Sequence, residues 1–275
     1  MTIIRSVIFY ITIFIYLQVE GDYVSVWLFR FYLIWFGCGF VLLSFDILPP
    51  ALQWANAVFL TLAGLLGGIY FLKQYGPKKG ITYSLFVIIM SISIEHIGVQ
   101  YQWWFGHYHY TQDFGPMIGG VPFAIGFAWL MVMAGAHEIS RTLLHRLSNL
   151  VYLLLFIIVG GLLAVSIDLI LDPVAFHVKN YWVWTKGSFY YDIPFTNFSG
   201  WFILAAFFQL LAHIWFYKDP PKDMIWRTRV IVVYSSTQIL FIWLAFLGGL
   251  YGAALLVTSL MLLWGLVYIK MRHDS

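Results

Sequence analysis

The chain has 275 residues, of which 62% are hydrophobic and 10% are charged, and its formal net charge is +3. Soluble domains carry about 25% charged residues, so this composition excludes a water-soluble fold and indicates an integral membrane protein. The small net charge is spread over short loops, which argues against a nucleic-acid partner. Cys38 is the single cysteine, so an intramolecular disulfide and a cysteine-based metal cluster are also excluded.

Nine apolar segments are long enough to cross a bilayer, which takes about 20 mostly apolar residues. They lie at 3–19, 24–45, 51–72, 82–101, 119–138, 149–171, 199–217, 229–247 and 250–269. These runs are continuous rather than alternating, which predicts helices and not barrel strands. The first follows Arg5 without a small-residue cleavage site, so we interpret it as a retained span. The predicted fold is all-α, a polytopic transmembrane helical bundle of eight or nine spans in one integral membrane domain over 1–275.

Basic and aromatic loops alternate along the chain after residue 73. The aromatic loops are 102–118, without Lys or Arg, and 172–198, with Lys179 and Lys186 only. The basic segments contain Lys73, Lys78 and Lys79, then Arg141 and Arg146, then Lys218, Lys222, Arg227 and Arg229, and finally Lys270 and Arg272. Lys and Arg in short loops mark the cytoplasmic side. This predicts a multi-pass cell-membrane protein with a cytoplasmic C-terminus and both aromatic loops on the opposite side.

The start of the chain does not fit this alternation. Nine spans with a cytoplasmic C-terminus place the N-terminus outside, whereas Arg5, Glu20 and Asp22 suggest the opposite. An early segment lying in the interface would give eight spans. Elsewhere, Gly64 with Gly68 and Gly248 with Gly252 have the four-residue spacing that lets helix backbones approach each other, so we assign these glycines a packing role.

Three carboxylates in or beside predicted spans are candidates for chemistry. Glu95, in "SISIEHIGVQ", is inside the span 82–101, and an ionisable group there usually faces a cavity or a partner. Asp168 and Asp172, in "SIDLILDP", are four residues apart on one helix face. The residue before a proline disfavours helical geometry, so this helix is predicted to end at Asp172. The pair suits proton donation and acceptance, whereas structural hydrogen bonds are the alternative for all three residues.

The two long loops are unusually rich in rings. In "WWFGHYHY", residues 103–110, the spacing of His107 and His109 suits a strand or turn, and no set of histidines has the helical spacing of a metal site. An interfacial aromatic belt explains Trp103 and Trp104. The stretch "GSFYYDIPFTNFSGW", residues 187–201, interleaves Asp192 and Asn197 with its rings. Irregular backbone at membrane depth faces a cavity or protein, so this stretch is predicted to form a lid or pocket wall.

Three motifs in this order resemble the membrane carotenoid biosynthesis family. They are "EHIG…FGHYHYT…PMIGGVP", "DLILDPVA" and "GSFYYDIPFTNFSGW", which together cover about residues 95–201. The last motif is the most specific, although this chain has Asp192 where the family pattern has glycine after the paired tyrosines. The characterised members are carotenoid 1,2-hydratases, including the bisanhydrobacterioruberin hydratases. The resemblance therefore implies a hydro-lyase that adds water to the terminal 1,2 double bond of an acyclic, ψ-end carotenoid taken from the bilayer.

The implied chemistry suits the carboxylates and rings. An acid protonates the alkene, aromatic faces stabilise the resulting tertiary cation, and water captures it while a base takes the released proton. Glu95 is the favoured acid, with Asp168 or Asp172 handling the water, and these labels are exchangeable. The expected substrate-binding residues are Tyr108, Tyr110, Trp182, Trp184, Tyr190, Tyr191, Asn197 and Trp201. Carotenoid and water are the expected partners, without metal or cofactor, and other enzymes of the carotenoid pathway are candidate partners.

Two other functional classes are compatible with intramembrane carboxylates. A transporter or proton-coupled carrier would use them as a proton relay, but such proteins usually contain internal repeats, and neither aromatic motif occurs twice. A carotenoid- or retinal-binding protein without enzymatic activity is the third class. In its opsin-like form it needs a lysine within a late span, and the spans after residue 199 have none in mid-membrane.

Overall fold

The computed structural model describes residues 22–111, 115–147, 149–185, 187–217 and 219–273, so the predicted span 3–19 lies outside the described residues. Within them, eight helices are long and apolar enough to cross a membrane. They are α2 (Asp22–Ser44), α3 (Trp54–Tyr75), α4 (Pro77–Tyr101), α5 (Phe123–Leu143), α6 (Asn149–Pro173), α7 (Phe195–Phe216), α8 (Met224–Leu247) and α9 (Tyr251–His273). Each corresponds to one predicted apolar segment, which confirms the transmembrane helical bundle.

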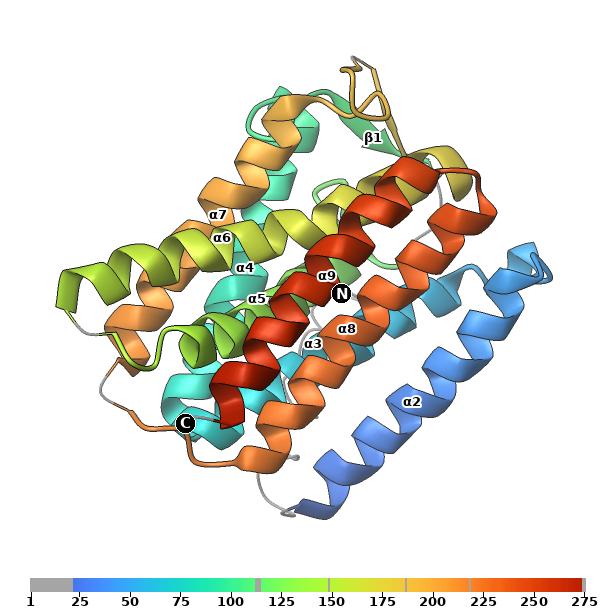
Figure 1. Ribbon diagram of the computed structural model, residues 1–275. Coiled ribbons are helices and arrows are strands. Elements are labelled where there is room, and N and C mark those ends of the chain that lie inside the picture. Colours follow the sequence, from blue (N-terminus) through green and yellow to red (C-terminus); the bar gives the residue numbers. More distant parts are fainter. Residues whose placement is uncertain (1–21, 112–114, 148, 186, 218, 274–275) are drawn as a thin grey trace.

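Successive helices run in opposite directions, so the connections fall at two ends of the bundle (Figure 1). At one end the basic segments meet. Lys79 at the start of α4 pairs with Asp219 at 2.5 Å, and Arg141 Nη2 donates to the Asp219 backbone carbonyl at 2.5 Å. The aromatic loops lie at the other end, with the short η1 turn (Pro50–Leu52) that precedes α3. The alternation of basic and aromatic loops in the sequence therefore matches the two ends of the bundle.

Helix α5 forms the buried centre of the bundle, and small residues let its neighbours approach. A Cβ atom added at Gly64 of α3 would lie 2.3 Å from the Phe127 carbonyl oxygen of α5. Likewise, a Cβ atom at Gly135 of α5 would lie 2.4 Å from the Tyr234 ring of α8. Both distances are too short for any side chain, so these helices pack this closely only because glycine occupies the two positions. The packing role predicted for Gly64 is confirmed.

Two helices begin at different residues from those predicted. Helix α5 starts at Phe123 rather than 119, because β2 (Met117–Ile118) and β3 (Val121–Pro122) form a tight hairpin before it. The hairpin turns at two glycines whose φ angles are 59° and 85°, a region that disfavours other residues. Helix α7 starts at Phe195 rather than 199, because Pro194 has the extended conformation of a helix N-cap. Its first turn therefore carries residues that were expected in the loop.

The predicted end of the sixth helix at Asp172 is wrong. Helix α6 continues through Pro173 and passes into a π-helical turn, η2 (Val174–Val178). A proline has no N–H group, so it leaves the carbonyl of Leu169, four residues earlier, without its helical partner. The Tyr190 hydroxyl donates to this carbonyl at 2.7 Å. Proline is tolerated inside a membrane helix when another group satisfies the freed carbonyl, and Tyr190 is that group here.

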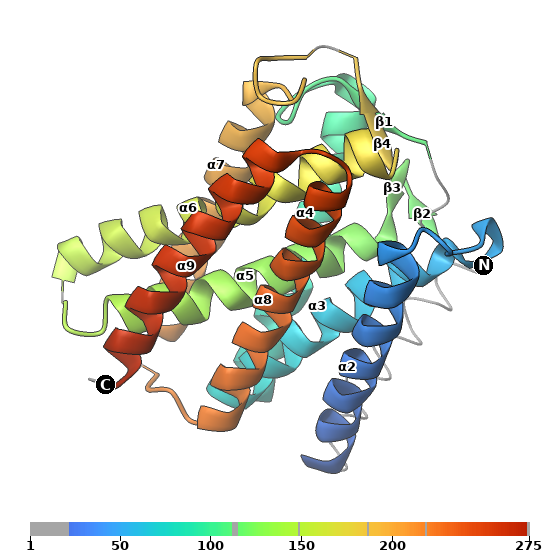
Figure 2. The same ribbon diagram turned by 45° about the vertical axis from the view of Figure 1, so that its right-hand side comes forward.

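The two aromatic loops join as a two-stranded antiparallel ribbon (Figure 2). Strand β1 (Tyr108–Tyr110) pairs with β4 (Trp182–Trp184) so that Tyr108 is opposite Trp184 and Tyr110 is opposite Trp182. Alternate side chains of a strand face the same side. Rings therefore gather on one face of the ribbon, and it covers the end of the bundle as a lid. Both loops therefore lie at the same end of the bundle, as predicted, and their non-cytoplasmic location stays a prediction.

Candidate functional site

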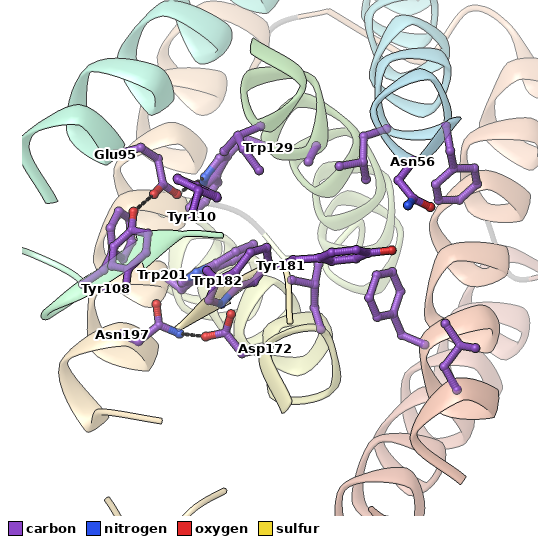
Figure 3. Close-up of a pocket in the computed structure, with 18 of the residues that line it drawn as sticks. Asn56, Glu95, Tyr108, Tyr110, Trp129, Asp172, Tyr181, Trp182, Asn197 and Trp201 are labelled. Carbon is purple, nitrogen blue, oxygen red and sulfur yellow. Dashed lines mark hydrogen bonds between the residues drawn. The ribbon is translucent and has the colours of Figure 1, made fainter. Parts of the chain in front are cut away.

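A cavity lies beneath the ribbon, and we call it the carboxylate cavity (Figure 3). The volume open to the centre of a water molecule is about 80 Å³. A single water requires about 10–15 Å³ on this measure, so the space suits several waters or a slender chain end. Its lining is mostly apolar and comprises Leu43, Asn56, Phe59, Leu60, Glu95, Phe105, Tyr108, Tyr110, Ile125, Ala128, Trp129, Leu171, Asp172, Tyr181, Trp182, Trp184, Asn197, Trp201, Leu240, Phe241 and Leu244.

Glu95 is held in this cavity by two donors from different elements. It lies near the end of α4, and only 6% of its surface is exposed. The Tyr108 hydroxyl of β1 donates to Oε2, and the Trp129 indole N–H of α5 donates to Oε1 at 3.1 Å. Trp129 can only donate, whereas a tyrosine hydroxyl can donate or accept. Oε1 is therefore fixed as an acceptor, while Oε2 faces a group that is able to exchange a proton.

The two tyrosines of β1 remain protonated over the ordinary pH range. Burial raises the pKa of the Tyr108 and Tyr110 phenols well above their usual value, and Glu95 raises both further when it is ionised. Desolvation is the larger cause because the phenolate is the charged form. Both hydroxyls therefore serve as neutral hydrogen-bonding groups within the carboxylate cavity, and Tyr108 keeps its contact with Glu95.

The two aspartates of α6 meet a single amide on α7. Asn197 Nδ2 donates to Asp168 Oδ2 at 2.8 Å and also to Asp172 Oδ2. Asn197 reaches them because α7 begins at Phe195, which places the amide in its first turn. Asp172 lines the cavity, whereas Asp168 lies behind it, with no exposed surface. Two carboxyl groups that share one amide form a unit able to hold or release a proton.

Aromatic rings form the remaining walls in stacked or edge-to-face pairs. Trp129 stacks on Trp201 of α7, with ring centroids 4.2 Å apart and an interplanar angle of 25°. The ring centroids of Trp184 and Tyr108 lie 4.8 Å apart across the ribbon. The Trp184 indole N–H is buried and has no hydrogen-bond partner among the described protein atoms. The cavity thus presents several π faces, carboxyl oxygens at two places and a spare donor.

Eight of the eleven expected site residues line the carboxylate cavity: Glu95, Tyr108, Tyr110, Asp172, Trp182, Trp184, Asn197 and Trp201. Asp168 contacts the cavity only through the shared amide of Asn197. The structure places Tyr190 and Tyr191 elsewhere. Tyr190 satisfies the carbonyl freed by Pro173, and the Tyr191 hydroxyl accepts the Ala253 backbone N–H in the first turn of α9 at 3.0 Å. Both tyrosines therefore make contacts that hold helices together, away from the cavity lining.

Sequence reasoning missed Trp129, Tyr181 and Asn56, which also line the cavity. Trp129 was the one most open to discovery, because it lies inside an apolar span and not near an interface. A buried tryptophan usually has a partner for its N–H, and the preceding predicted span contains the carboxylate Glu95. Asn56 marks the other end of the cavity: Figure 3 shows it on the far side from Glu95, with Tyr181 extending between the two sides.

A metal site was not expected from the sequence. Within the described part of the chain, no group of three or more His, Cys, Asp or Glu side chains is arranged to hold a metal ion. The chemistry open to the site from its own side chains is proton transfer by carboxyl groups and stabilisation of a cation by rings.

Comparison with known proteins bears on this arrangement. The sequence model of a family described as "Carotenoid biosynthesis protein" matches residues 55–264, a range that includes the three motifs of 95–201. The chain is also similar to a "Bisanhydrobacterioruberin hydratase" from Haloarcula japonica, with 28% identity over 183 residues. This match covers 62% of the chain and spans 61% of the length of that relative. No solved structure matches the chain. Because the family match covers well over half of its residues, the chain belongs to the carotenoid biosynthesis protein family.

Proposed function

We propose that the protein is a hydratase that adds water to the terminal 1,2 double bond of an acyclic carotenoid. The observation that carries this proposal is the placement of Glu95 and Asp172 in one cavity walled by aromatic rings. The similarity to a protein named as a hydratase supports the same reaction class. A transporter requires neither the ring-lined enclosure nor a lid of two paired strands, so the hydratase accounts for more of the site.

In the first step, Glu95 acts as the acid. The proton leaves Oε2, and the π electrons of the alkene form the new C–H bond at the less substituted carbon. The neighbouring carbon, which bears two methyl groups, becomes a tertiary cation. Oε1 continues to accept the Trp129 N–H, and the Tyr108 hydroxyl donates to the newly charged Oε2. Hydrogen bonds to a charged group are roughly twice as strong as neutral ones, so both contacts favour the proton transfer.

In the second step, water attacks the cation and forms the C–O bond. Asp172 accepts the released proton, and its partner amide Asn197 holds the carboxylate in place. Asp168 shares that amide and is the second member of the proton-holding unit. Across both steps the alkene gains one hydrogen and one hydroxyl, and no electrons are transferred. Proton return from Asp172 to Glu95 through water or Tyr108 would restore the starting state.

The rings stabilise the cation between the two steps. A cation over an aromatic face within about 6 Å of its centroid is stabilised by about 2 kcal/mol or more when the site is desolvated. Trp201 and Trp129 form a stacked pair against one side of the cavity, and Trp182 and Trp184 lie on the ribbon that covers it. The Trp184 indole N–H has no partner among the described protein atoms and is able to donate to the attacking water or the product hydroxyl.

Isotope labelling tests the reaction. Cells that make an acyclic carotenoid and express this protein should accumulate a more polar tertiary alcohol, with the hydroxyl on the carbon that bears two methyl groups. Growth in ¹⁸O-labelled water should place ¹⁸O in the product, and deuterium oxide should leave one deuterium on the neighbouring carbon. Mass spectrometry reads both. A product whose oxygen comes from O₂ would make the protein an oxygenase and refute the proposal.

A further inference from the structure

A second cavity adjoins the carboxylate cavity, and we call it the apolar cavity. It lies between α2, α3 and α8 and is larger, with about 260 Å³ open to the centre of a water molecule. Its lining is almost entirely hydrocarbon and aromatic: Ile34, Trp35, Phe36, Cys38, Gly39, Leu42, Leu43, Leu48, Leu52, Trp54, Ala55, Asn56, Phe59 and Leu240. Nothing in the proposed acid–base chemistry uses this space.

The two cavities share a wall. Leu43, Asn56, Phe59 and Leu240 line both of them. In Figure 3, Asn56 lies at the end of the carboxylate cavity away from Glu95. The apolar cavity therefore adjoins the end of the site that carries no carboxylate.

The shape of the apolar cavity suits a long, slender and nonpolar molecule. Its lining follows α2 from Ile34 to Leu43, which is nine steps of about 1.5 Å, or roughly 14 Å of helix length. Helix α2 is mostly unburied and lies at the edge of the bundle in both views. Within the described part of the chain, the cavity behind it thus lies at the lipid-facing side of the bundle, where a molecule dissolved in the bilayer reaches it without crossing water.

Helix α2 is attached at a few points around this space. Trp35 Nε1 donates to the Ala55 carbonyl of α3 at 3.3 Å, and Tyr32 bonds Ser236 of α8 at 2.8 Å. Near its end, Ser44 accepts the indole N–H of α8 residue Trp243 at 2.8 Å. These bonds hold α2 against the bundle and leave the apolar cavity between the points of attachment.

We propose that the apolar cavity holds the part of the substrate's polyene chain that follows the terminal alkene, while the alkene itself lies in the carboxylate cavity. The inference rests on the proposed function and deepens it. The substrate enters from the bilayer beside α2, and the seam between α2 and α3 selects for chain length. A short acyclic terpene with the same terminal alkene fills only the carboxylate cavity, whereas a full-length acyclic carotene fills both.

Two glycines of α2 provide a matched pair of variants. A Cβ atom added at Gly39, which lines the apolar cavity, or at Gly37, which does not, meets no atom of the described residues within 4 Å. The positions are two residues apart, so they point to opposite faces of the helix. Gly39→Phe fills the cavity, and Gly37→Phe places the same ring toward lipid. Gly39→Phe should lower kcat/KM for the carotene at least tenfold, the equivalent of losing the burial of about two CH₂ groups. The short terpene should be unaffected, and Gly37→Phe should leave both substrates unchanged.

Cys38 gives a second measurement that does not depend on turnover or on a variant. It is the single cysteine of the chain, it lines the apolar cavity and it is exposed. The carotene should slow alkylation of wild-type Cys38 by a membrane-permeant maleimide, and the short terpene should not. If Gly39→Phe treats both substrates as wild type does and the carotene leaves the alkylation rate unchanged, the inference is refuted while hydration stands. Protection of Cys38 without any hydrated product would instead refute the proposed function and support the polyene site.

Discussion

Replacing Glu95 by glutamine tests the acid with the least change to the fold. The glutamine carbonyl still accepts the Trp129 N–H, because that bond involves only Oε1. The new amide group takes the place of Oε2 and donates to the Tyr108 hydroxyl, which accepts as well as it donates. Size and hydrogen bonds are therefore retained, and the only function removed is the exchangeable proton.

The expected loss follows from that single function. A positioned general acid typically contributes about 10²- to 10⁴-fold in rate, which corresponds to about 3–5 kcal/mol in the activation barrier. Tyr108→Phe provides a graded comparison, since it removes one hydrogen bond to Glu95 and leaves the proton. Hydrogen bonds to charged groups contribute about 1.5–3 kcal/mol, so this variant should lose about 10- to 100-fold, less than Glu95→Gln.

The assay is conversion of an acyclic carotene by purified protein in lipid, followed by chromatography of the tertiary alcohol. The amount of monodisperse protein recovered from detergent checks that each variant folds. Wild-type turnover by well-folded Glu95→Gln would refute the assignment of the acid. The acid would then be sought in the pair that shares Asn197, and Asp172→Asn would be the next variant to measure.

Three further predictions concern the lid and the ends of the bundle. Asp192 has φ 57°, where a non-glycine residue is strained by about 1 kcal/mol. Asp192→Gly should therefore retain full activity and raise Tm slightly. A lower Tm would show that the Asp192 side chain stabilises the fold. Tyr190→Phe should lower the free energy of unfolding by about 1–3 kcal/mol, because the Leu169 carbonyl in α6 loses its donor. The kcat/KM of the folded enzyme should not change. A loss of substrate affinity instead would indicate that Tyr190 contacts the substrate. The third prediction uses a chain with Cys38→Ala, into which single cysteines are introduced. A cysteine that replaces Phe189, which is 95% exposed, should react with an impermeant maleimide from the non-cytoplasmic face, whereas a cysteine that replaces Lys79 should not. Labelling of both positions from one face would contradict the alternation of basic and aromatic ends.

The sequence predicted the features that depend on one helix at a time, namely the existence of each span and its carboxylates. The apolar runs predicted the described helices, and Glu95 with the aspartates identified the elements that surround the site. The predicted helix boundaries were wrong where turn or proline geometry, and not hydropathy, decided where a helix begins or ends. The apolar run 119–138 conceals a glycine turn, and the rule against helix before proline failed at Asp172 because a distant hydroxyl, Tyr190, satisfies the freed carbonyl. That bond joins residues 21 apart, a separation at which no local pattern indicates contact.

The contents of the site were only partly accessible for a related reason. Rings in the loops were recognised by their density, but Tyr190 and Tyr191 were indistinguishable from Tyr108 and Tyr110 until their partners were known. Trp129 and Asn56 lie in apolar spans with no accompanying motif, and their role depends on which helices face each other. Strands β1 and β4 are more than 70 residues apart in the sequence. No local sequence pattern therefore predicted that they pair to form the lid.

The hydrogen bonds of the three carboxyl groups also bear on the order in which the membrane domain is built. Chains emerge from the ribosome N-terminus first, at about 5–20 residues per second, and an unpaired polar group in lipid costs several kcal/mol. Tyr108 follows Glu95 by 13 residues, and Asn197 follows Asp172 by 25. Each carboxyl group thus gains its first partner from the next segment to be synthesised, within seconds of entering the bilayer. Insertion as successive helical hairpins, α4 with its following loop and then α6 with α7, would give these buried carboxyl groups their partners early and so limit the cost of inserting them into the bilayer.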